Sequence, residues 1–303
     1  MIAFTVNNIF SSLDLLNLRC FNFNKNNEVF GIETVTLTHL FHNALLITMI
    51  SKSIIKLIKS LSKKKYRIKE NLFLAEGDKI VLEVLNSDFA VKKLIATEDF
   101  IAQNTNLANR AEQLIQTEKE QIKKASLLQN PQNSIAICAL PHKQNLPRRI
   151  DRLSFYLDGI QDPGNLGTII RTCDWYGIQN IFISSNTVDV YNPKVIQASM
   201  GSFCRVNVIP VDIQLLKNLA EQSKLPVYGT FMEGKNIYSE NLVQESLIIM
   251  GNEGSGIREE AAKLVTNKIS IPTFSENSNT AESLNVAIAA GIICSEFKRR
   301  TIS

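Results

Sequence analysis

Three separated segments combine glycines with side chains suited to binding and polarising a substrate. The first, DPGNLGTIIRTCDWYG (residues 162–177), places Asn165 where a helix N-cap is expected and Arg171 a little under two turns later. Because ligands of open α/β folds bind at the carboxyl ends of the strands, both side chains are expected to face one space there. The motif alone equally fits a capped helix with a surface arginine.

The second segment, LIIMGNEGSGIREE (residues 247–260), runs from an apolar strand into three glycines, Gly251, Gly254 and Gly256, with Glu253 between them. Glycines permit positive φ and close approach of the backbone to a ligand. The segment matches neither the Walker A loop nor G-x-G-x-x-G, and its carboxylate argues against a phosphate cradle. A tight strand-to-helix turn is the structural alternative.

The third segment, AESLNVAIAAGIICSEFKRR (residues 281–300), predicts an apolar helix rich in small residues. Ser283 is the expected helix cap, which favours a buried C-terminal helix. Asn285, a polar amide at the mouth of this apolar helix, is not explained by packing.

An alternation of strands and helices positions these segments. From residue 153 the pattern predicts a mostly parallel sheet with helices on both faces. The expected strands are 153–158, 180–183, 205–209, 226–230, 246–250 and 268–271, and the expected helices are 165–176, 193–200, 212–222, 257–265 and 284–299.

A smaller α/β pattern precedes this one. Its strands are predicted at 73–77, 91–97 and 135–140 and its helices at 78–86 and 107–119, after a lysine-rich helix that begins near residue 50. The predicted organisation is a poorly ordered N-terminal extension (1–48), a small α/β domain (49–140), a linker (141–150) and a large α/β domain (151–303).

Composition limits the class of protein. With 303 residues, 45% apolar and 20% charged, the chain is globular and long enough to bury a core. Five scattered cysteines, none in a C-x-x-C pair, and three histidines argue against a disulfide framework and a metal site, and favour a cytoplasmic protein. No apolar run has the length of a membrane helix, and no signal peptide is predicted.

Positive charge is concentrated in the predicted small domain. Residues 49–145 hold 16 Lys and Arg against 10 Asp and Glu, whereas residues 146–303 hold 15 against 16. A run of one sign is not explained by internal i,i+4 pairs, so we predict an RNA-docking surface there, with a solvated helix face as the alternative. Its residues are Lys52, Lys56, Lys59, Lys63, Lys64, Lys65 and Arg67.

Taken in order, the motifs resemble the SpoU/TrmH family of the SPOUT superfamily. The matching residues are N-x-G-x-x-x-R-T at 165–172, G-N-E-G-x-G at 251–256, and I-P at 271–272 followed by E-S-L-N-V-A at 282–287. The resemblance implies an S-adenosylmethionine-dependent RNA ribose 2′-O-methyltransferase with a C-terminal trefoil knot, acting as a homodimer through this domain. The region 49–140 resembles the L30e-like substrate-binding domain that often precedes it, which favours ribosomal RNA over transfer RNA.

The resemblance also implies roles for single residues. Arg171 is the central catalytic residue. Since a guanidinium stays protonated, we expect it to bind the substrate phosphate and stabilise the developing alkoxide. Asn165 and Glu253 are expected to orient Arg171, and Ser283 and Asn285 to complete the pocket. The cofactor would be held largely by backbone groups of Gly251, Ile271 and Leu284, together with Thr230.

One departure from the family pattern concerns residues 273–282, which form a longer loop without the usual glycine and affect the expected cofactor contacts. Three other functions fit part of the sequence. An RNA base methyltransferase of the same superfamily would share the fold and cofactor. An RNA-binding protein without activity is disfavoured by the intact motif residues. A nicotinamide-binding oxidoreductase fits only the α/β pattern and is disfavoured by the missing dinucleotide fingerprint.

Overall fold

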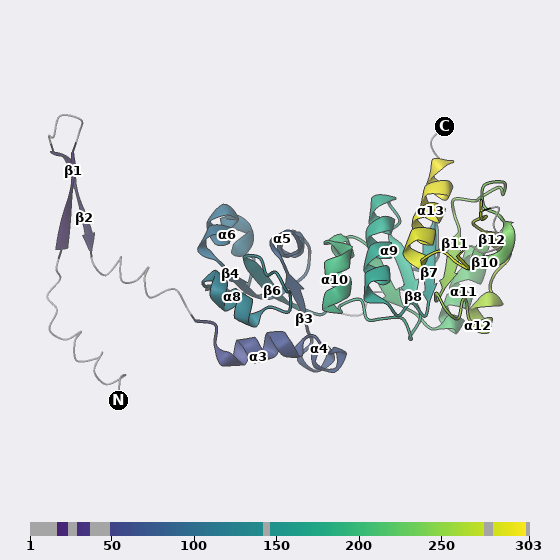
Figure 1. The fold of residues 1–303 in the computed structure, drawn as a ribbon, viewed down its shortest axis with the longest axis horizontal. Helices are drawn as coiled ribbons and strands as arrows, with labels where there is room; N and C mark the ends of the chain where they lie inside the picture. The colour runs from purple at the N-terminus through teal and green to yellow at the C-terminus, as the bar shows by residue number, and fades with distance from the viewer. Residues whose placement is uncertain (1–16, 24–28, 37–48, 142–145, 276–280, 301–303) are drawn as a thin grey trace.

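A computed structural model describes residues 17–23, 29–36, 49–141, 146–275 and 281–300. The described chain forms three sheets, of two, four and six strands (Figure 1). The six-stranded sheet and its helices make up the C-terminal half, and the four-stranded sheet lies beside it.

All six strands of the large sheet run parallel, in the order β12-β10-β11-β7-β8-β9. The prediction of a mostly parallel sheet is confirmed. The strands are β7 (Ser154–Asp158), β8 (Asn180–Ile183), β9 (Asn207–Pro210), β10 (Val227–Asn236), β11 (Leu247–Gly251) and β12 (Asn267–Ser270). The helices are α9 (Pro163–Trp175), α10 (Pro193–Ser199), α11 (Ile213–Ser223), α12 (Glu259–Ala262) and α13 (Val286–Arg299).

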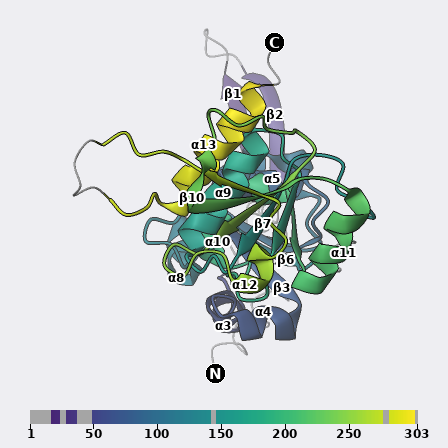
Figure 2. The same ribbon diagram turned by 90° about the vertical axis from the view of Figure 1, so that its right-hand side faces the viewer.

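Alternate residues of these strands pack into cores on opposite faces of the sheet. On β7, Phe155 and Leu157 join a core to which α9, α10 and α13 contribute, whereas Tyr156 joins a second core with α11 and α12. Figure 2 shows α11 and α13 on opposite sides of the strands. Helices therefore cover both faces, as strands buried on two sides require.

The smaller sheet has the order β3-β6-β4-β5, with β6 antiparallel to both its neighbours and β5 parallel to β4. Its strands are β3 (Leu72–Glu76), β4 (Val91–Ala96), β5 (Leu114–Gln116) and β6 (Ser134–Ala139). Its helices are α3 (Lys52–Ser60), α4 (Lys64–Glu70), α5 (Asp78–Asn86), α6 (Glu98–Gln103), α7 (Thr105–Ala108) and α8 (Lys119–Ala125).

The predicted helix over 107–119 is wrong. The segment instead contains the end of α7, the strand β5 and the first residue of α8. Ala108, Ile115 and Ile122 are all buried, and their spacing of seven residues matches two turns of one continuous helix. A short strand between two helices produces the same apolar spacing, so periodicity alone misassigned it.

The N-terminal extension differs from expectation in two segments. β1 (Asn17–Phe23) and β2 (Val29–Thr36) pair antiparallel in a sheet of their own. Two phenylalanines occur in β1, and β-branched residues make up most of β2; both residue types are enriched in strands. The rest of residues 1–48, and residues 142–145 of the predicted linker, lie outside the described residues, so the domain boundaries stay predictions.

Contacts between the two larger sheets are aromatic and ionic. Phe73 on β3 packs against Tyr191 and Phe203, with ring centroids 4.9 and 6.0 Å apart. Arg205 binds both Asp174 of α9 and Glu83 of α5. The apolar core is therefore continuous from the small sheet to the large one.

Candidate active site

The carboxyl ends of four neighbouring parallel strands form the edge at which the motifs meet. Thr230 lies in β10, Gly251 ends β11, and Ile271 directly follows β12. Asp158 ends β7, the next strand along. The predicted cofactor residues Thr230, Gly251 and Ile271 are thus on adjacent strands at one edge, where ligands of open α/β sheets bind.

Helix α9 begins earlier than predicted. Its N-cap is Asp162, whose side chain accepts a hydrogen bond from the backbone N–H of Asn165 at 2.8 Å, and Pro163 occupies the first turn. The prediction that Asn165 is the N-cap is therefore wrong. Since Asp162 caps the helix, the Asn165 amide is available for contacts outside it.

That amide joins the three sequence motifs. Its Nδ2 donates to the carboxylate of Glu253, and its Oδ1 accepts from Nδ2 of Asn285 at 2.9 Å. Asn285 in turn is the N-cap of α13, because its Oδ1 accepts from the backbone N–H groups of Ala287 and Ile288. The expected cap, Ser283, is an exposed residue before the helix.

The glycine-rich turn after β11 is held by its own side chains and by steric fit. Asn252 donates to the carbonyl of Gly159 at 3.0 Å and accepts from the N–H of Gly254 at 2.9 Å. A Cβ on Gly251 would lie 2.1 Å from the backbone carbon of Gly256. Gly256 itself has φ 67°, which favours glycine. Gly251 is therefore required for the turn that presents Glu253.

Arg171 lies on the exposed side of α9, and within the described residues its guanidinium makes no hydrogen bond or ion pair. The expectation that Asn165 and Glu253 orient it is not met, because Asn165 is bonded to Glu253 and Asn285 instead. Arg171 is consequently free to bind an anion that approaches this face.

An ion pair that no sequence motif predicts lies next to the glycine-rich turn. The buried carboxylate of Asp158 accepts hydrogen bonds from the backbone N–H of Arg258 at 2.9 Å and from its Nη2 at 2.6 Å. Bonding to this carboxylate raises the pKa of Arg258. In the sequence, the only feature that indicates this ion pair is an aspartate, Asp158, at the end of an apolar strand.

The lysines of the predicted RNA-docking surface are all exposed, on α3 and α4 and at the turn between them. Arg67, however, does not belong to that surface. Only 2% of its side chain is exposed, and its Nε and Nη2 donate to Asp189 at 3.0 and 2.5 Å. Asp189 belongs to the large unit, by which we mean the six-stranded sheet with its helices and loops; the small unit is the four-stranded sheet with its own. Its Nη1 donates to the carbonyl of Leu61. Arg67 is a structural residue that ties α4 to the large unit.

We expect Arg67→Met to lower the free energy of unfolding by about 1–2 kcal/mol. The figure lies below the usual cost of breaking a buried ion pair, because Asp189 keeps some access to water. Chemical denaturation measures it, with Lys69→Met, at an exposed side chain on the same helix, as the matched control. Equal stability of the two variants would show that the buried pair contributes little.

The described part of the chain contains no group of three or more His, Cys, Asp or Glu side chains placed to hold a metal ion. Among the described helices, none is long and apolar enough to span a bilayer.

Comparison with known proteins identifies the family. A family model described as the SpoU rRNA Methylase family matches residues 152–295, and one described as an MRM3-like substrate binding domain matches residues 52–136. A 23S rRNA (guanosine(2553)-2′-O)-methyltransferase of Bacillus subtilis is 31% identical over 78% of this chain and 92% of its own length.

Solved structures agree with this assignment. A protein assigned to the TrmH family of RNA methyltransferases from Porphyromonas gingivalis is 36% identical, with a TM-score of 0.75 over 84% of this chain and 100% of that one. An AdoMet-bound rRNA methyltransferase from Sinorhizobium meliloti is 27% identical, with a TM-score of 0.75 over 85% and 98%. The chain belongs to the SpoU methyltransferase family.

Proposed function

We propose that this protein transfers the methyl group of S-adenosylmethionine to a ribose 2′-hydroxyl of ribosomal RNA. The observation that carries the proposal is the Asn165–Glu253–Asn285 network, which gathers three distant motifs at the carboxyl edge of the sheet. The B. subtilis relative is named for ribose 2′-O-methylation of 23S rRNA, which supports both the reaction and the substrate.

The residues at this edge fit the cofactor. At Gly251 the turn packs against the backbone of Gly256 with no room for a Cβ, so the chain offers main-chain groups rather than a side chain at this position. Thr230, Gly251, Ile271 and Leu284 would hold the molecule, which supplies an electrophilic methyl group. Residues 276–280 of the lengthened loop lie outside the described residues, and the expected knot stays a prediction.

The chain's own residues must handle a weak nucleophile. A ribose hydroxyl develops negative charge as it attacks, and a preorganised cation nearby stabilises that charge. We assign this role to Arg171, which also binds the adjacent phosphate through its planar fork. Asn165 and Asn285 position Glu253 at the pocket, and the exposed Ser283 borders it.

Incubation with tritiated S-adenosylmethionine and ribosomal RNA, followed by mass mapping of the nucleosides, tests the reaction. We expect the label on ribose. A label on a base would instead indicate the related base methyltransferase activity, and cofactor binding without label in any RNA would indicate a binding protein. Transfer RNA, assayed in parallel, separates the two RNA classes.

We propose the exposed lysines of α3 and α4 as the RNA-docking surface, with Arg67 excluded. Changing Lys63, Lys64 and Lys65 together to Ala should reduce the slope of log affinity against log salt by roughly two to three units if each contacts a phosphate. Folding should be unaffected, since all three are exposed. An unchanged slope would mean that the run is only a solvated surface.

We also propose a homodimer through the large unit. Trp175 on α9 is 85% exposed and Ile288 on α13 is 57% exposed. These helices lie side by side (Figure 1), joined by the Asn165–Asn285 bond, and their exposed apolar side chains make them the candidate interface. A Trp175→Glu variant that remains dimeric in analytical ultracentrifugation would rule out this interface.

Buried free thiols such as Cys138 and Cys173 support a reducing, cytoplasmic location.

A further inference from the structure

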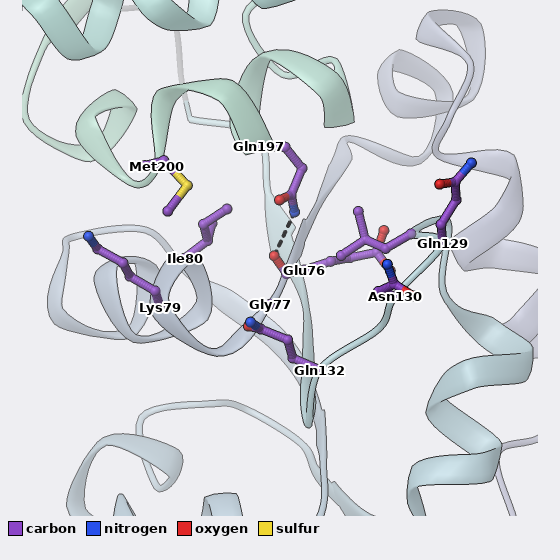
Figure 3. Close-up of a pocket in the computed structure, with 10 residues that line it drawn as sticks. Glu76, Gly77, Lys79, Ile80, Gln129, Asn130, Gln132, Gln197 and Met200 are labelled. Atoms are coloured by element: carbon purple, nitrogen blue, oxygen red, sulfur yellow. Dashed lines mark hydrogen bonds between the residues drawn. The ribbon is translucent and has the colours of Figure 1, made fainter.

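A cavity of about 330 Å³ lies between the small and large units. It is lined by the end of β3, the start of α5, the segment before β6, and α10 (Figure 3). Its size is in the range of small-molecule sites, roughly 300–1,000 Å³. Gln197 of α10 crosses the junction and donates to the carbonyl of Glu76 at 2.7 Å.

Two carboxylates fix the walls of this cavity. Glu76 is buried, and its Oε1 accepts from the hydroxyl of Ser126 at 2.6 Å and the N–H of Leu127 at 3.1 Å. Asp78 accepts from the N–H and side chain of Asn133 at 2.9 and 2.7 Å. The segment between these anchors, which carries Gln129 and Asn130, is therefore held against β3 and α5.

Several polar groups in the cavity are not used by the fold. Within the described chain, Lys79, Gln129 and Asn130 are exposed at the mouth of the cavity, and their side chains make no hydrogen bond or ion pair. Gln132 uses its Oε1 to accept from the N–H of Asp78 at 2.6 Å, which leaves its Nε2 as a donor. Gln197 uses its Nε2, which leaves its Oε1 as an acceptor.

These groups match a nucleobase. Side-chain amides present a donor and an acceptor together, the pattern that pairs with the edge of a base, most often adenine. The half-buried Leu128 and Met200 supply apolar surface for the ring, and the Lys79 ammonium supplies charge for a phosphate. Carboxylates do not compete for the ligand, because Glu76 and Asp78 are already bonded to the wall.

We propose that this cavity binds an unpaired nucleobase of the substrate RNA, apart from the nucleotide that is methylated. Sequence-specific binding of RNA usually targets such splayed bases in loops and bulges. Gly167 of α9 packs directly on α10, since its Cβ would lie 2.5 Å from that of Ala198, so only α10 separates the cavity from the helix that carries Arg171. The inference rests on the proposed RNA substrate and adds a base-reading site to it.

Fluorescence anisotropy of the full chain with labelled single-stranded oligo(A), oligo(C), oligo(U) and alternating GU RNAs tests the proposal. We expect oligo(A) to bind between about 5- and 100-fold more tightly than the others, the range for one amide–base pair. Gln129→Ala with Asn130→Ala should remove that preference. Lys79→Ala should weaken all four RNAs alike and lower the salt slope by about one.

The matched control is Gln103→Ala with Asn106→Ala, two exposed amides elsewhere on the small unit, which should leave the preference unchanged. Equal binding of the four RNAs by the natural chain, or a preference that survives the Gln129/Asn130 change, would overturn the proposal. The proposal would also be overturned if the Gln129/Asn130 change abolished binding of free adenosine monophosphate but left the RNA preference intact.

The methyl-transfer assay is independent of this test. A chain that transfers no methyl group to RNA but loses its base preference in the Gln129/Asn130 variant would retain the base site without the proposed activity. A chain that methylates ribose without any base preference would retain the activity without the site.

Discussion

Arg171→Lys is expected to reduce turnover at least about 100-fold, the lower range for losing a major electrostatic donor in a transition state. Lysine keeps the charge but not the planar fork that spans two oxygens. Because Arg171 is exposed and its side chain makes no hydrogen bond or ion pair with another described residue, the fold does not depend on its guanidinium. Single-turnover methyl transfer with saturating cofactor measures the effect, and calorimetry should show cofactor affinity nearly unchanged.

Arg152→Lys is the matched control for this experiment. Arg152 is a half-exposed arginine that precedes β7, at the end of the sheet opposite the motifs, and it pairs with Asp151. Its replacement should leave turnover within about twofold, as for a surface ion pair. Turnover of the Arg171→Lys variant equal to that of this control would remove Arg171 from the catalytic machinery.

Gly251→Ala is expected to weaken cofactor affinity by roughly 100-fold, near the upper range of about 3 kcal/mol for overpacking a fitted site. The added methyl would lie 2.1 Å from the carbon and 2.4 Å from the oxygen of Gly256, both backbone atoms that cannot rotate away. The turn must therefore open, and Glu253 must move with it. Titration calorimetry with S-adenosylmethionine measures the loss.

Gly254→Ala in the same turn is the control. Its Cβ would meet only the Asn252 side chain at 3.5 Å, an ordinary contact. We expect its cofactor affinity to stay within about threefold of the natural chain, since a surface change without a clash costs at most about 0.5 kcal/mol. If both variants bound cofactor equally well, the tight turn would not be part of the cofactor site.

The sequence by itself determined the class of fold and most of its elements. Apolar runs separated by amphipathic segments are a local property, and they located all six strands and all five helices of the large sheet. The main differences in extent are β10, which runs to Asn236 rather than residue 230, and α12, which is only Glu259–Ala262. The local conformation of the glycine-rich motif is likewise determined by its own residue types. The glycines of residues 251–256 permit a turn that other residues would obstruct, whatever surrounds it.

The spacing of apolar residues did not distinguish a continuous helix from a short strand between two helices. The seven-residue interval of Ala108, Ile115 and Ile122 fits a helix, and only the parallel pairing of β5 with β4 makes Ile115 part of a strand. The helix cap was also ambiguous, because Asp162 and Asn165 are both good N-cap residues and lie three positions apart.

Only the tertiary structure decided which polar side chains meet. Arg67 stands in a run of lysines, yet it is buried because Asp189, 122 residues away, faces it across the junction. Asn165 binds Glu253 and Asn285, and Asp158 binds Arg258, through contacts between residues 88 to 120 positions apart. Such pairs leave no periodic trace in the sequence, because the folding of distant strands and helices onto one sheet edge brings them together.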